Sequence, residues 1–130
     1  MGDFIDREKL NAVFDEHVKQ ANEIFVDTEQ MSRVLDETDR VLFSEPILKD
    51  ACPDINDLNG MVRSYVSGQY TEASPKSICA ILGAFMYLNK SSDEIADNIP
   101  VIGYLDDLVM LSNAIEIAKE DLELYRSSVS

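Results

Sequence analysis

The stretch ICAILGAFMYL, residues 78–88, decides the fold because nearly every position in it is apolar or small. A helix that is apolar on all sides is either buried inside a protein or placed in a membrane. This run has 11 residues, whereas a helix that spans a bilayer needs roughly 20. Ser74 and Pro75, just before the run, form a typical helix start. We therefore predict a buried helix over residues 75–90, around which the rest of the chain packs.

The rest of the chain shows the periodicity of amphipathic helices, with apolar residues recurring at steps of three and four positions. Asp27 with Gln30 predicts the start of one helix, Pro46 predicts its end, and Gly68 predicts the end of another. No segment alternates between apolar and polar residues as a strand would. The sequence predicts an all-α bundle of about five helices, near residues 7–26, 28–43, 54–67, 75–90 and 104–126, and leaves residues 44–53 unassigned.

The length and composition fit one domain in a reducing compartment. Of the 130 residues, 45% are hydrophobic, which is enough for a core without a metal or a disulfide. The first residues carry several acids and no apolar run, which argues against a secretory signal. Cys79 lies in the apolar run, where we expect it to be buried, whereas Cys52 precedes Pro53 in a loop, where it could be exposed. Two reduced thiols predict a cytoplasmic protein.

The strong negative charge limits the classes of partner. There are 25 acidic residues against 11 basic ones, which gives a net charge of −14. This charge opposes direct binding to DNA, RNA or anionic lipid, because each of these needs a basic surface. It is compatible with solubility alone, with a basic protein partner, or with divalent cations.

Residues between about 61 and 114 carry a family resemblance. It rests on the run MVRSYVSGQY at 61–70, the apolar helix that ends in Tyr87, the acidic spacing from Asp93 to Pro100, and the segment VIGYLDD at 101–107. Together they resemble the YkvA-like domain, a bacterial domain of unknown function numbered 1232. The resemblance implies a helical region over residues 56–126 and no defined activity. The N-terminal helices of residues 1–55 lie outside it, and we expect both parts to form one domain, residues 1–130.

Some members of this family sit in or near membranes, so the resemblance implies a peripheral membrane role as one hypothesis. The chain departs from the family at Ser91 and Ala96, where the family usually has proline. Together with the net charge of −14, these departures argue against membrane binding here.

Four aspartates in this region form the candidate metal site: Asp93, Asp97, Asp106 and Asp107. Asp93 and Asp97 are one helical turn apart, and like charges at this spacing repel by about 0.2–0.5 kcal/mol. Carboxylate oxygens suit Mg²⁺, Ca²⁺ or Mn²⁺. We prefer a structural alternative, in which Asp106 and Asp107 lie in the first turn of the last helix and the helix dipole stabilises each by about 0.3–1 kcal/mol. In this alternative, Asp93 belongs to a separate short helical turn that begins at Ser91.

Few other residues are candidates for catalysis or ligand binding. His17 falls on the polar side of the first predicted helix, where we expect a solvated side chain. Tyrosines of the family-like region, such as Tyr87, either hydrogen-bond the aspartates across the bundle or pack with the hydroxyl in water. The sequence contains no glycine-rich phosphate loop, zinc-ligand spacing or serine-nucleophile elbow. We therefore assign no catalytic and no cofactor-binding residue.

These observations favour a non-catalytic protein–protein interaction module with a basic partner. The first alternative is a divalent-metal-binding protein, or a metal-dependent enzyme, that uses the four aspartates with Mg²⁺ or Ca²⁺. The second alternative is the peripheral membrane protein that the resemblance implies. The sequence leaves the oligomeric state open.

Overall fold

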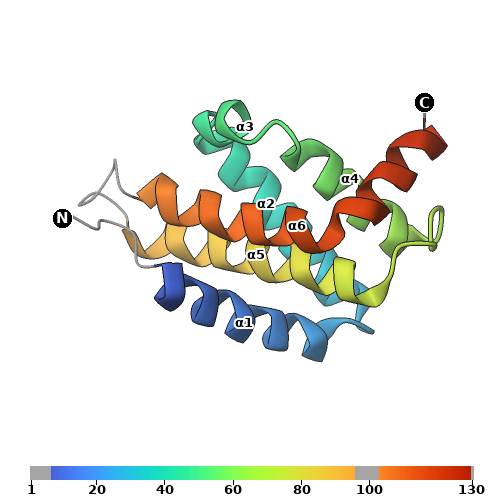
Figure 1. The fold of residues 1–130 in the computed structure, drawn as a ribbon, viewed down its shortest axis with the longest axis horizontal. Helices are drawn as coiled ribbons and strands as arrows, with labels where there is room; N and C mark the ends of the chain where they lie inside the picture. The colour runs from blue at the N-terminus through green and yellow to red at the C-terminus, as the bar shows by residue number, and fades with distance from the viewer. Residues whose placement is uncertain (1–6, 96–102, 130) are drawn as a thin grey trace.

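The computed structural model describes residues 7–95 and 103–129, and the predicted all-α fold is confirmed there. This part of the chain contains six helices and no strand (Figure 1). The helices are α1 (Arg7–Ile24), α2 (Thr28–Ser44), α3 (Ile47–Ala51), α4 (Ile55–Ser67), α5 (Pro75–Ile95) and α6 (Gly103–Val129).

Local signals in the sequence set several of the helix ends. The Asp27 carboxylate accepts a hydrogen bond from the backbone N–H of Gln30, at 3.1 Å, and so satisfies one of the free amides at the start of α2. At the end of α4, Gly68 has φ of 87°, the left-handed conformation that glycine adopts without strain. Both ends agree with the sequence predictions.

Two features of the helices differ from the predictions. The unassigned residues 44–53 contain α3, whose five residues are too few to produce a periodic pattern, although Leu48 anchors it in the core. The separate helical turn predicted from Ser91 is wrong, because α5 continues through that position to Ile95. A buried, already formed helix extends at low cost, since each added residue gains a hydrogen bond without a new nucleation step.

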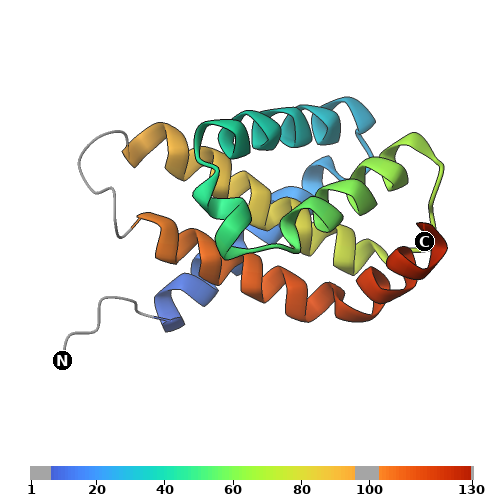
Figure 2. The same ribbon diagram turned by 90° about the horizontal axis from the view of Figure 1, so that it is seen from above.

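Helix α5 is buried where its sequence is apolar. Every residue from Ser77 to Phe85 is buried, and α5 contacts α1, α2, α4 and α6. Figure 1 shows α1 running along one side of α5, and Figure 2 shows α5 between α2 and α6. Within the described ranges, no helix has an apolar stretch long enough to cross a membrane.

Gly83 allows α1 to approach α5 closely. A Cβ atom at this position would lie 3.0 Å from the backbone nitrogen of Val18 and 3.1 Å from its Cα. Because the opposing atoms belong to backbone, they cannot move aside as a flexible side chain could. A residue larger than glycine would therefore push α1 away from α5.

Polar contacts join helices at the surface of the bundle. Two arginines each bridge two carboxylates of another helix, and their side chains are partly exposed, so each pair adds only about 0–1 kcal/mol. The pairs are Arg63 with Asp36 (3.0 Å) and Asp39 (2.6 Å), and Arg126 with Asp54 (2.5 Å) and Asp57 (2.7 Å). They connect α4 to α2 and to the end of α6, and so fix the position of α4.

Asp121 of α6 caps the first turn of α5. Its Oδ2 accepts hydrogen bonds from the Ser74 N–H at 3.1 Å, the Ser74 hydroxyl at 2.9 Å and the Ser77 hydroxyl at 2.6 Å. Burial alone would raise the pKa of Asp121, but the hydrogen bonds from Ser77 and Ser74 outweigh it and lower the pKa below its usual value. The start of the buried helix is thus joined to the last helix of the chain.

We predict that Phe85→Ala lowers the free energy of unfolding by about 3–5 kcal/mol, through lost burial and the cavity left behind. Phe85 is fully buried, whereas the exposed fraction of Phe43 is 87%. The matched control Phe43→Ala should therefore change stability by no more than about 0.5 kcal/mol. Urea unfolding of both variants measures this, and equal effects of the two substitutions would contradict the placement of α5.

Candidate functional site

The structure describes the side chains of two candidate aspartates, Asp106 and Asp107, and places them in different environments. Asp106 lies in the first turn of α6, as predicted, and is half-buried. Asp107 is the fifth residue of a helix that begins at Gly103, and its exposed fraction is 5%. The prediction that both lie in the first turn is therefore wrong for Asp107, because α6 begins one residue earlier than expected.

Tyr87 and Asp106 connect α5 to α6. The Tyr87 hydroxyl donates a hydrogen bond to the Asp106 carboxylate. Burial raises the pKa of Asp106, and this hydrogen bond to the charged form offsets only part of the rise. Of the two roles foreseen for the tyrosines, Tyr87 thus hydrogen-bonds an aspartate across the bundle.

His17 of α1 completes this cluster, and its predicted solvation is wrong. Only 8% of its surface is exposed, and its Nδ1 lies 2.9 Å from the Val13 carbonyl oxygen. Its ring packs edge to face against the ring of Tyr87, with 5.5 Å between the two ring centroids. The sequence signal that could have revealed this is spacing. His17 follows the buried Phe14 by three positions and precedes the buried Ala21 by four, so it belongs to the inward stripe of α1.

The four aspartates are not all placed by the structure. Asp97 lies outside the described residues, and Asp93 is described only through the helical backbone of α5. Among the described residues, no three His, Cys, Asp or Glu side chains are grouped so that they could hold a metal ion. The four-aspartate metal site therefore stays a prediction.

Both cysteine thiols are buried and unpaired. Cys79 lies in the core as predicted, with Sγ 3.4 Å from Oδ1 of Asn22. Cys52 is also buried, contrary to the exposed loop position considered from the sequence, because it ends α3 against the core. Burial raises the pKa of both thiols, which keeps them in the unreactive protonated form.

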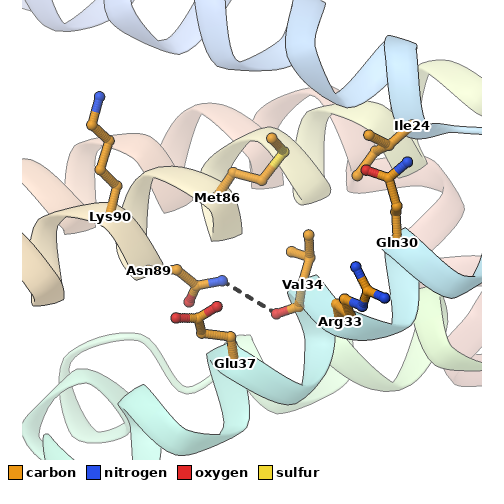
Figure 3. Close-up of a pocket in the computed structure, with 8 residues that line it drawn as sticks. All are labelled: Ile24, Gln30, Arg33, Val34, Glu37, Met86, Asn89 and Lys90. Atoms are coloured by element: carbon orange, nitrogen blue, oxygen red, sulfur yellow. Dashed lines mark hydrogen bonds between the residues drawn. The ribbon is translucent and has the colours of Figure 1, made fainter.

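A buried polar network joins α2 to α5. Thr38 is fully buried, and its hydroxyl lies 2.8 Å from the Val34 carbonyl oxygen and 3.1 Å from Oδ1 of Asn89. The Asn89 side chain donates to the same Val34 carbonyl at 3.2 Å (Figure 3). Each buried polar group thus has a partner, so the network fixes how α2 lies on α5.

Next to this network lies a candidate binding surface. Helices α1 and α2 both pack on α5 but make few contacts with each other, and a cavity of about 380 Å³ opens beside them. Figure 3 shows the side chains of α2 and α5 facing this space. We call it the α5 groove, and it is lined by Ile24, Gln30, Arg33, Val34, Glu37, Met86, Asn89 and Lys90.

The α5 groove combines an apolar floor with charged side chains. Met86, Val34 and Ile24 supply half-buried apolar surface. Glu37 and Lys90 make no hydrogen bond or ion pair with any residue that the structure describes, so both are free to meet a ligand. None of the described residues that line the groove is a histidine, cysteine, serine or threonine.

Comparison with known families places part of this site in a known domain. Residues 77–112 match the model of a family described as protein of unknown function (DUF1232). The resemblance to the YkvA-like domain is thereby confirmed over this segment. No curated protein and no solved structure matches the chain.

The DUF1232 segment contributes to both features described above. It supplies Tyr87 and Asp106 of the polar cluster, and Met86, Asn89 and Lys90 of the α5 groove. Residues 61–76 belonged to the predicted region of resemblance but lie outside the match. Because the family is described as having unknown function, the match assigns no activity to the chain.

We predict that Tyr87→Phe and Asp106→Ala each lower the free energy of unfolding by about 0.5–1.5 kcal/mol, because each removes the same hydrogen bond. The double variant should lose no more than either single variant does, a coupling that a double-mutant cycle in urea measures. Fully additive losses would show that the two side chains do not interact.

Asp106→Ala and a further variant, Asp107→Asn, test the metal alternative. A structural role predicts melting temperatures that do not respond to millimolar Mg²⁺ or Ca²⁺, for the parent protein and for Asp107→Asn alike. A cation-induced rise in the parent that Asp106→Ala or Asp107→Asn abolishes would instead support a metal site.

Proposed function

We propose that this domain is a non-catalytic protein-interaction module and that the α5 groove is its binding surface. The observation that carries the proposal is an open apolar floor, formed by Met86, Val34 and Ile24, beside the unpaired charges of Glu37 and Lys90. Apolar floors with a few polar groups at the edge are typical of surfaces that bind a partner segment.

The proposed occupant is a segment of a partner protein that inserts one large apolar side chain between α1 and α2. A volume of about 380 Å³ accommodates such a side chain with its neighbouring backbone. A basic residue next to this anchor would pair with Glu37. The net charge of −14 favours a basic protein as the partner, because like charges repel at long range.

The remaining chemistry of the molecule supports binding over catalysis. Both thiols are buried, and the ring of His17 is enclosed by Tyr87 and by its own helix. Among the described residues that line the groove there is no serine, cysteine or histidine. These features favour recognition as the main role.

We predict that peptides selected on the parent protein from a random displayed library share one large apolar residue. Met86→Lys, which places a charge on the groove floor, should weaken their binding by about tenfold or more. The matched control Ile47→Lys, on the partly exposed side of α3, should leave binding unchanged. Calorimetric titration measures both, and thermal melts verify that both variants fold.

Three outcomes would contradict the proposal. The library could yield no enriched peptide, the peptides could bind Met86→Lys as tightly as the parent, or Ile47→Lys could weaken binding equally. Because Met86→Lys changes a half-buried position, Glu37→Gln serves as a milder variant, and it should weaken those peptides that carry a basic residue next to the anchor.

A further inference from the structure

The outward side of α6 exposes apolar residues in a regular pattern. The exposed fraction is 38% for Ile117 and 57% for Leu124. The two residues are seven positions apart, which is about two helical turns, so they lie above one another on the same side of α6. The opposite side carries the buried Leu111, Ala114, Ala118 and Leu122. Ile117 and Leu124 are therefore not part of the core stripe.

Three glutamates share this outward side. Glu116, Glu120 and Glu123 are exposed, and none of them makes an ion pair or hydrogen bond with a residue in the described ranges. Their spacing of three and four positions places them in a row beside Ile117 and Leu124. Lys119 lies at the edge of the row, so the net charge of the surface is negative. We call Glu116, Ile117, Glu120, Glu123 and Leu124 the α6 face.

The bundle leaves the α6 face uncovered. Asn113, at its start, donates a hydrogen bond to Asn11 of α1 at 2.9 Å, whereas Glu116, Ile117, Glu120, Glu123 and Leu124 are all exposed. A hollow of about 450 Å³ opens beside Ile117, between α6 and the first turn of α5. The lining of this hollow includes Lys76 and Lys119, whereas the row of glutamates and the two exposed apolar side chains run along α6 beside it.

We propose that the α6 face binds a basic amphipathic helix of a partner protein, independently of the α5 groove. Apolar side chains of that helix would contact Ile117 and Leu124, and its lysines or arginines would pair with the three glutamates. A second copy of this chain is a poor occupant, because two acidic faces on molecules of net charge −14 repel each other. An anionic membrane is repelled for the same reason.

The probe for the test is a synthetic leucine–lysine helical peptide of about 18 residues, which is about twice as long as the α6 face and so can cover all of it. Its dissociation constant is measured by fluorescence anisotropy at low and at physiological salt. The parent protein should bind it, with affinity that falls as salt rises. The triple variant Glu116→Gln/Glu120→Gln/Glu123→Gln should weaken binding by about tenfold or more.

The matched control neutralises three exposed acids on α1: Glu8→Gln/Asp15→Asn/Glu16→Gln. It changes the net charge by the same amount, and it should weaken binding by less than about twofold if the local face is what matters. Ile117→Ser/Leu124→Ser should weaken binding at all salt concentrations, because it removes apolar contact. All these positions are exposed, so the variants should fold.

Some results would overturn the proposal. Equal weakening by the α6 and α1 triple variants would mean that the peptide responds only to net charge. No binding to the parent at low salt would exclude the surface. Met86→Lys should leave peptide binding unchanged. If this variant no longer bound the peptide, the binding site would be the α5 groove instead.

Discussion

The rest of the structure depends on the burial of α5 over residues 77–85. An apolar helix of this length is stable in water only if other helices cover it, and α1, α2, α4 and α6 do so. Gly83 lets the backbone of α1 come close, and Asp121 holds the first turn of α5 to α6. Helices α1, α2 and α6 are thus positioned mainly by α5, whereas α4 packs mainly on α2 and α6.

The α5 groove follows from this arrangement. Because α1 and α2 each pack on α5 and touch each other little, they leave a space between them that is lined by residues of all three helices. The buried pair Thr38–Asn89 keeps α2 at a fixed position on α5. If a partner binds this surface as proposed, a floor held in place by the core would lower the conformational entropy lost on binding.

Periodicity predicted the five longer helices within a few residues, because long amphipathic stripes leave a clear pattern in the sequence. It missed α3, which is too short to leave such a pattern, and it split the end of α5, where polar residues continue a helix that is already formed. His17 was misjudged because its acidic neighbours in sequence do not decide which way its own side chain points. The α5 groove was not predictable, since it depends on the distance between two helices that both pack on a third.

Native-state amide hydrogen exchange tests the central role of α5 most directly. If α1, α2 and α6 are positioned by α5, the amides of residues 78–88 should be the slowest in the protein and should exchange only when the whole domain unfolds. The amides of α3, which has a single anchor in Leu48, should exchange much faster. Exchange of the α5 amides through a local opening, while α1 and α6 stay protected, would contradict this account.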